Sequence, residues 1–266
     1  MQRRSFTILR VAGALVLLAH CWTMVATSSV AQQARPRSTR ASVQALNTVA
    51  THAMPGVDNA ALRAQHPLSA GVGPLRFAEP LTTEITPATH GTWETLDDGT
   101  QLWRLRVHSS DAISLSLGFA SYRMPPGGEL FVYAPGYEDL IGPFTADDNA
   151  AHGELWTPIV PGDEAIIEVT VPAGQRSALR LTLGQVSHGF RSLRAASTAK
   201  QSGACNIDVA CEEAYPWQAQ ARSVGRYTLS TGVLCSGALV NNTAGDQTPF
   251  FLTANHCGIT PDNAAS

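Results

Sequence analysis

Strict alternation of apolar and polar residues is the feature that most constrains how this chain can fold. The runs 103–107, 113–117 and 179–183 each place an apolar residue at every second position. Turn-forming residues separate such runs, as at 125–128 (Pro-Pro-Gly-Gly) and 161–162 (Pro-Gly). Successive side chains of a strand point to opposite faces, so this period indicates strands with one buried and one wet face. Short turns favour antiparallel neighbours, and we therefore predict a β-sandwich over residues 91–190.

The composition agrees with a folded chain that has real cores. Of 266 residues, 44% are hydrophobic and 15% charged, with 18 basic against 21 acidic side chains. The length allows one large domain or two modest ones. No large field of one sign exists to steer a nucleic acid, so we predict no nucleic-acid partner.

The N-terminus has the three parts of a secretory signal peptide. Three arginines among the first ten residues precede an apolar stretch from Val11 to Ala19, and small residues follow at 29–31. A positively charged region, an apolar region and a small-x-small cleavage site are typical of a secretory signal peptide. We predict a signal peptide over residues 1–31, cleaved between Ala31 and Gln32.

Two other interpretations of this segment are weaker. His20 interrupts an apolar run that is already well short of the ~20 residues a spanning helix needs. Cys21 invites a lipoprotein reading, but His20 is too large for the small residue expected before a lipidated cysteine. We expect a secreted protein, extracellular or periplasmic, with no membrane association after signal cleavage.

The rest of the chain divides by composition. Residues 32–90 are rich in Ala, Thr, Pro and Arg with little periodicity, which predicts a loosely ordered leader. A short helix near 58–65 is the alternative there, because Asp58 could cap it. Residues 191–202 are small and polar, as in a linker. A cysteine-bearing segment follows at 203–266.

Four cysteines remain once a signal peptide is removed. They are Cys205, Cys211, Cys235 and Cys257, and an even count in an exported chain indicates disulfides. A zinc site is disfavoured, because the chain has no Cys-x-x-Cys and His256 is adjacent to Cys257. We predict no metal and no cofactor.

The cysteine-bearing segment contains two apolar stretches, at 232–240 and 249–257, joined by a polar loop at 241–248. This order predicts a β-hairpin. Cys235 lies near the start of one strand and Cys257 at the end of the other. A bridge between them would close a loop of about 23 residues and stabilise it by about 3 kcal/mol.

The two stretches of this hairpin resemble sequence motifs of a known protein family. Cys-Ser-Gly-Ala-Leu-Val at 235–240, followed by Phe-Leu-Thr-Ala-Asn-His-Cys at 251–257, resembles the histidine strand pair of chymotrypsin-like serine proteases. Asn255, together with Ser-Gly-Ala-Cys-Asn-Ile-Asp-Val at 202–209, is more narrowly similar to the secreted bacterial lysyl endopeptidases. This resemblance covers about residues 202–260.

The upstream motifs at 103–107 and 142–145 are similar to propeptides of such secreted proteases, with less specific signals. The resemblance therefore implies an all-β chain with two parts. A β-sandwich pro-domain at 91–190 would be followed, at 203–266, by the incomplete first β-barrel of a chymotrypsin-like protease.

The resemblance also implies roles for single residues. His256 would be the general base of a Ser-His-Asp triad, a role that suits an imidazole with a pKa near neutrality. Cys235 and Cys257 would pair with each other. Cys205 and Cys211 would pair with cysteines further along the chain, and those are absent from this sequence.

The main departure from the family follows His256. Ten residues remain after it, and they contain no Gly-Asp-Ser-Gly-Gly to supply the nucleophile. No Gly-x-Ser-x-Gly or His-Glu-x-x-His occurs as substitute machinery. A triad acts as a unit, so we expect this chain to have no peptidase activity by itself.

The only lysine of the chain is Lys200, five residues before Cys205. A junction of about ten residues would hold a randomly placed lysine about one time in twenty-five. We therefore predict that an enzyme cutting after lysine matures between Lys200 and Gln201.

Two functions follow. The first is the precursor of a secreted serine endopeptidase, with protein or peptide substrates for the full-length enzyme and a propeptide–protease domain contact. The alternative is a secreted, non-enzymatic β-sandwich module for binding or adhesion, with vestigial protease strands. Inhibition or assisted refolding of a complete homologous protease by residues 32–200 would distinguish them.

Overall fold

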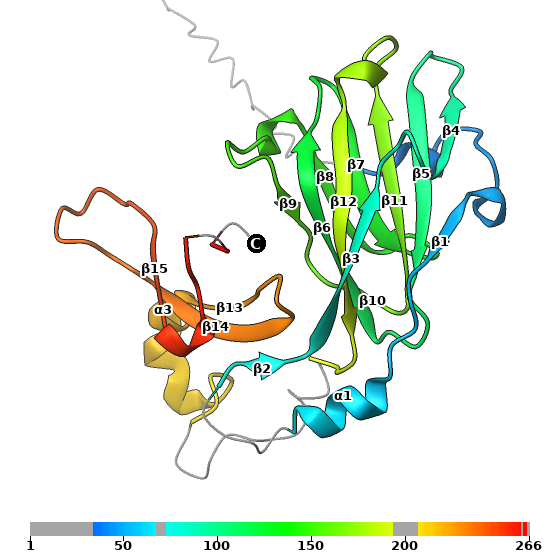
Figure 1. Ribbon diagram of the computed structural model, residues 1–266. Helices are drawn as coiled ribbons and strands as arrows, with labels where there is room; N and C mark the ends of the chain where they lie inside the picture. Colours follow the sequence, from blue (N-terminus) through cyan, green and yellow to red (C-terminus); the bar gives the residue numbers. More distant parts are fainter. Residues whose placement is uncertain (1–33, 68–72, 194–206, 262, 265–266) are drawn as a thin grey trace, which may run out of the picture. The chain divides into compact units, whose positions relative to one another are not determined.

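The structure, a computed structural model, describes residues 34–67, 73–193, 207–261 and 263–264. These residues all belong to one contact unit that runs from Ala34 to Ser266. Strands dominate it and its helices are short, so the all-β prediction is confirmed (Figure 1). Each helix in the described part of the chain is too short or too polar to span a lipid bilayer.

One sheet of the sandwich is built around β5. Its strands lie in the order β1-β5-β11-β7-β8, and β4 also pairs with β5. All pairs are antiparallel except β1 with β5, which is parallel. The bounds are β1 Thr51–Ala53, β4 Thr92–Thr95, β5 Gln101–His108, β7 Glu129–Ala134, β8 Glu138–Phe144 and β11 Glu164–Val171.

The second sheet has the order β10-β6-β12-β3, with β9 also pairing β6, and all its pairs are antiparallel. The bounds are β3 Ala78–Ile85, β6 Ser114–Arg123, β9 Leu155–Trp156, β10 Val160–Pro161 and β12 Arg180–Gly189. Short 3-10 helices lie in the connections at Ala146–Asp148 (η3) and Arg176–Ala178 (η4).

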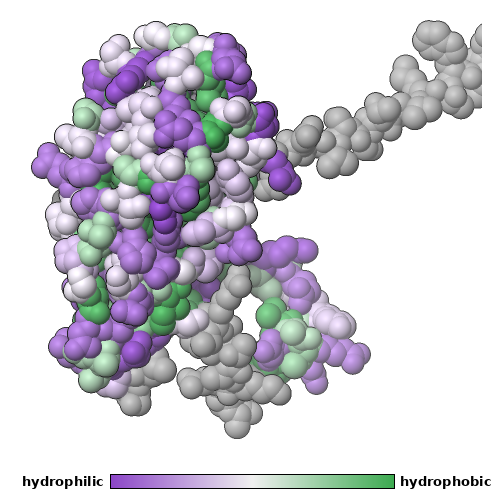
Figure 2. All heavy atoms as spheres, turned by 90° about the vertical axis from the view of Figure 1, so that its right-hand side faces the viewer, coloured by the Kyte–Doolittle hydropathy of each residue, from purple (hydrophilic) through white to green (hydrophobic). Residues whose placement is uncertain are grey.

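The hydrophobic core lies between these two sheets. Trp103 and Leu105 of β5 belong to the same buried cluster as Leu117 of β6 and Leu183 of β12. The alternating residues therefore face inward from both sheets, as in a sandwich. The face of the molecule in Figure 2 is mostly hydrophilic, with apolar residues in small scattered spots.

The expected leader contains ordered elements. The short helices η1 Arg37–Thr39 and η2 Leu46–Thr48 come first, and β1 and β3 are strands of the two sandwich sheets. The sandwich thus takes strands from upstream of Thr92. Periodicity did not indicate β3 because Pro80 interrupts it, and β3 lies at the end of its sheet, where a proline is tolerated.

The helix given as the alternative near Asp58 is present as α1, Asn59–Gln65, in place of a loosely ordered segment. One carboxylate oxygen of Asp58 accepts hydrogen bonds from the backbone N–H groups of Ala60 and Ala61, both at 2.9 Å. This is the N-cap arrangement that satisfies the free donors of a first helical turn.

The C-terminal segment forms a third sheet. Its strands are β13 Val224–Thr228, β14 Val233–Val240 and β15 Phe250–Thr253, preceded by η5 Glu212–Trp217 and α3 Gln218–Ala221. The predicted hairpin is present, because β14 and β15 pair antiparallel from Gly237–Thr253 to Val240–Phe250. The second strand ends earlier than expected, at Thr253, and residues Asn255–Cys257 form the 3-10 helix η6. Gly258 ends that helix in the left-handed region, with φ 73°.

This third sheet is open in the described residues. Most large apolar side chains of the sandwich are buried, whereas several of this sheet are exposed: Val224, Leu239, Val240, Phe250, Phe251 and Leu252. A strand from elsewhere in the chain extends this sheet, because β2 Leu75–Arg76 pairs antiparallel with β14.

Several predictions concern residues outside the described part of the chain. They are the signal peptide at 1–31 with its junction Ala31–Gln32, the maturation junction Lys200–Gln201 with most of the linker at 191–202, and Cys205. These remain predictions.

Candidate functional site

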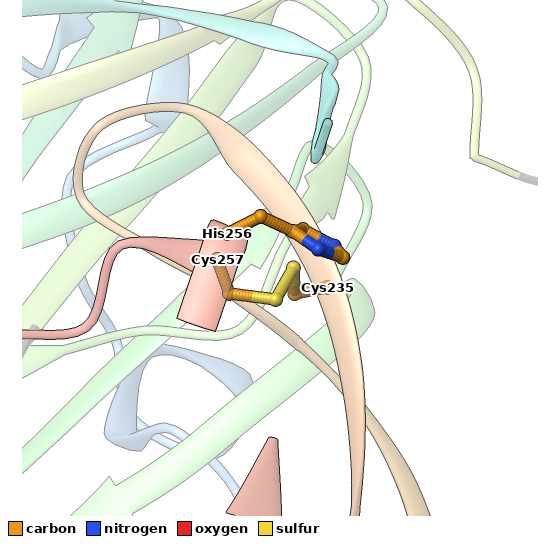
Figure 3. Close-up of side chains that lie close together, drawn as sticks. All are labelled: Cys235, His256 and Cys257. Carbon is orange, nitrogen blue, oxygen red and sulfur yellow. A yellow bond between two sulfur atoms is a disulfide. The ribbon is translucent and has the colours of Figure 1, made fainter. Parts of the chain in front are cut away.

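A disulfide joins Cys235 of β14 to Cys257 of η6, the pair that the resemblance implies (Figure 3). Their Cα atoms lie 6.1 Å apart, they are separated by 22 positions in the sequence, and both residues are buried. In the chain-entropy picture, closing such a loop contributes about 3 kcal/mol. The bond fixes the turn after β15 onto the middle strand of the sheet.

His256 lies in this fixed turn, between Asn255 and Cys257. Its side chain is exposed, next to the buried disulfide (Figure 3). Among the residues that the structure describes, none forms a hydrogen bond or ion pair with the imidazole ring. The disulfide thus fixes the backbone at His256, and the exposed ring has no partner within the described residues.

Thr253, at the end of β15, fixes the chain just before His256. Its hydroxyl donates to the carbonyl oxygen of Ser236 at 2.9 Å. The same hydroxyl lies 2.7 Å from the Tyr227 hydroxyl of β13, which then acts as the donor. Thr253 therefore links β13, β14 and β15 at the point where the chain turns toward the histidine.

A cavity of about 330 Å³ opens beside His256. The hairpin sheet contributes one wall, and a segment some 160 residues upstream contributes another. The lining residues are Gly73, Pro74, Leu75, Arg226, Leu234, Cys235, Ser236, Ala254, His256 and Cys257. Local sequence patterns carried no signal for the upstream residues, since nothing near them is periodic and their partners are distant in the chain.

The cavity contains one hydroxyl side chain on the hairpin, that of Ser236. No hydrogen bond joins this hydroxyl to the His256 ring in the described part of the chain. The cavity therefore contains an imidazole and a hydroxyl that are not hydrogen-bonded to each other, so the described residues do not form a Ser-His pair there.

Cys235, His256 and Cys257 also form the kind of cluster that can hold a metal ion, with one ligand atom each within 4.8 Å of the others. Both sulfur atoms are in the disulfide, however, so neither offers the thiolate that a metal requires. In this oxidised state the cluster anchors the histidine and lacks a ligand set for an ion.

The other two cysteines lie apart from this cluster. Cys211, just before η5, is a free and exposed cysteine. Cys205 is outside the described residues. Their pairing with later cysteines stays a prediction.

The fold and the site together define an all-β protein in which a β-sandwich precedes a hairpin with an exposed histidine next to a disulfide. Two family models match the chain: Lysyl endopeptidase N-terminal domain over residues 42–190, and Lysyl endopeptidase, C-terminal domain, over residues 199–266. The chain belongs to the lysyl endopeptidase family.

A curated relative supports this assignment. The chain is 28% identical over 205 residues to a lysyl endopeptidase from Pseudomonas aeruginosa. The match covers 72% of this chain and 43% of the relative. The chain thus corresponds to less than half the length of that protein.

Proposed function

We propose that this chain is the front part of the precursor of a secreted serine endopeptidase that cleaves after lysine. It would supply the signal peptide, the pro-domain and the first, histidine-bearing segment of the catalytic domain. The observation that supports this most directly is His256, fixed by the Cys235–Cys257 disulfide within a segment that matches the family.

His256 would act as the general base. An imidazole near neutrality can take the proton of a serine nucleophile and return it to the leaving amine. The exposed ring faces no competing hydrogen-bond partner in the described residues, and a cavity beside it has room for reacting groups. The serine nucleophile and the triad acid would be contributed by sequence beyond the hairpin. Without them we expect no peptidase activity from residues 1–266.

The sandwich would act as a folding template and inhibitor for the catalytic domain. A chymotrypsin-like domain is dominated by contacts between distant residues, and such topologies fold slowly. A preformed domain can hold early strands in register and cover exposed edges. The pairing of β2 with β14 supports such a contact between the two parts.

Secretion and maturation complete the proposal. The N-terminal segment has the three-part pattern of a signal peptide, and Lys200 is the chain's one lysine, placed at the start of the C-terminal family match, which begins at residue 199. A lysine-directed protease could therefore separate the pro-domain from the catalytic segment at Lys200–Gln201.

The test has two arms. Purified residues 1–266 should release no product from a lysyl amide substrate, and measurable turnover would contradict the inactivity part. The coding sequence after codon 266 should be read in all frames for Gly-Asp-Ser-Gly-Gly. If it is there, the extended protein should cleave the same substrate, and His256→Ala should lower kcat by at least about 10⁴-fold.

A matched variant gives the control. Asn255→Ala changes the neighbour of His256 and leaves the imidazole in place, so it should affect turnover far less than His256→Ala. Equal activity of the His256→Ala and unmodified extended proteins would refute the general-base role. Binding of the sandwich to surfaces or glycans, without any effect on a protease, would favour the non-enzymatic module.

A further inference from the structure

We propose that residues 73–78, here called the blocking strand, occupy the edge of β14 that leads to His256, and so exclude extended peptides from it. This inference rests on the proposed protease function for its biological meaning. The structural claim does not depend on that function: a segment of the sandwich part occupies an edge of β14 to which an extended peptide could otherwise bind.

The two edges of β14 show where the blocking strand lies. At Leu234 the strand has partners on both sides, Thr228 of β13 and Leu75 of the blocking strand. At Gly237 it again has two partners, Gly225 of β13 and Thr253 of β15. Since β13 takes one edge throughout, β15 and the blocking strand must share the other edge, end to end.

On this shared edge of β14, the gap between β15 and the blocking strand lies at the candidate functional site. β15 leaves the shared edge at Thr253, and the blocking strand joins it at Leu234, so Cys235 and Ser236 lie between them. The chain that leaves there carries His256, and Gly73 to Leu75 line the same cavity as its ring. An extended peptide that reached His256 along this edge would need the hydrogen-bonding groups that the blocking strand already uses.

Main-chain hydrogen bonds hold the blocking strand on β14. The N–H groups of Phe77 and Ala78 both donate to the carbonyl oxygen of Gly232, at 2.9 and 3.2 Å. Arg76 pairs with Val233 and Leu75 with Leu234. This is strand addition to a free edge, where the backbone supplies affinity with little regard to side chains.

The sandwich holds the other side of the blocking strand. The carbonyl oxygen of Phe77 accepts the N–H groups of Phe190 and Arg191, at 3.0 and 3.2 Å, and the Arg191 guanidinium donates to the Arg76 carbonyl at 2.9 Å. Phe77 itself is buried. A strand fixed in its bound shape loses little entropy on docking, so this one is a preorganised competitor.

The blocking strand also resists the enzyme it would block. Its sequence is Gly-Pro-Leu-Arg-Phe-Ala, and the chain has no lysine before Lys200. An enzyme directed to lysine has no target bond in it, so cleavage at Lys200 alone would leave the edge occupied.

Two substitutions can displace the blocking strand from opposite sides. Phe77 donates to Gly232, and hydrogen-bonded pairs alternate in an antiparallel ladder, so Leu75 and Leu234 form the next bonded pair. Leu75→Pro removes that donor, whereas Arg76→Pro adds the same ring at a non-bonded position and is the control.

On the β14 side, Gly232 has φ 78°, and a Cβ there would lie 2.0 Å from the Ala78 carbonyl oxygen. Gly232→Ala therefore expels the strand. Gly245→Ala is its control, because Gly245 has a similar φ of 63° with open space around it.

The experiment uses the full chain and two readouts. Hydrogen exchange with mass spectrometry follows the amides of Phe77, Ala78 and Leu234, with the buried strand β11 as the folding control. A labelled peptide of sequence Gly-Pro-Leu-Arg-Phe-Ala is the binding probe, and the imidazole resonance of His256 reports where it binds. Peptidase activity is not measured, so failure of the proposed function and failure of this inference are distinguishable.

We expect the unmodified chain and both controls to exchange slowly at these amides and to leave the probe unbound. Leu75→Pro should exchange at least about tenfold faster at the Leu234 amide, bind the probe and shift the His256 resonance. Gly232→Ala should show the same fast exchange but bind no probe, since its methyl group obstructs the edge. Unchanged exchange in both variants, or a vacated edge in Leu75→Pro that takes no probe, would overturn the inference.

Discussion

The Ser109 hydroxyl donates a hydrogen bond of 2.7 Å to Nδ1 of His188 in the interior of the sandwich. Both residues are fully buried. With its proton on Nε2, the ring donates to the side-chain oxygen of Asn59 at 2.8 Å. His188 of β12 thereby ties the first residue of α1 to the sandwich, and it does so as a neutral imidazole.

This arrangement predicts a loss of stability in acid. Burial lowers the pKa of His188 below its ordinary value, against a smaller opposing effect of Asp111 and Glu79. The unfolded chain therefore binds a proton at higher pH than the folded one, so stability is complete above about pH 6.5 and falls as pH drops below it. Urea unfolding at pH 7.5 and pH 5 measures this, and in His188→Gln the pH-dependent loss should shrink. An identical loss in both proteins would contradict the assignment.

The Cys235–Cys257 disulfide should stabilise the hairpin sheet rather than the sandwich. Cys257→Ser is expected to cost the third sheet about 3 kcal/mol, because the unfolded loop is no longer closed. Hydrogen exchange should rise over β14 and β15 and stay unchanged over β5 and β11. Cys211→Ser is the control and should change nothing, since that thiol is free and exposed.

A buried and an exposed ion pair on the sandwich should differ in their contribution. The Arg104–Glu94 pair is almost fully buried, with side-chain exposures of 2% and 11%, whereas Asp98 in the Arg37–Asp98 pair is 53% exposed. Glu94→Ala leaves a guanidinium buried without its charge partner, which costs about 3–5 kcal/mol. Asp98→Ala should cost much less, because water and salt screen the charge of an exposed carboxylate. Urea denaturation of the two variants tests this, and equal losses would show that burial does not set the difference.

Maturation should depend on the single lysine. Lys200→Gln in the extended precursor should abolish cleavage at the junction by a lysine-directed protease, and Lys200→Arg should also block it if arginine is not accepted. N-terminal sequencing of the product from the unmodified precursor is expected to begin at Gln201. A different first residue would refute the assignment of this junction.

Much of the sandwich could be predicted from periodicity, because β5, β6 and β12 alternate along their length. The Asp58-capped helix and the 232–257 hairpin were likewise visible in local residue patterns. β1 could not be predicted, because three residues are too few to show an alternation of apolar and polar side chains. β3 was not predicted because Pro80 interrupts its pattern. The pairing of Leu75 with Leu234 could not be predicted at all, because it joins two short segments far apart in the chain and only folding brings them together.

The position of β2 along the chain has a consequence for the order of events. The sandwich contacts of this strand, from the end of α1 to Arg191, all precede β14 in the sequence. Because synthesis also runs from the N-terminus, the sandwich can fold before the hairpin is complete, since domains generally fold as units in that order. When β14 forms, β2 is already fixed by the sandwich in the position at which the two strands pair. The first strand pairing of the hairpin sheet is then the docking of β14 onto a preformed strand.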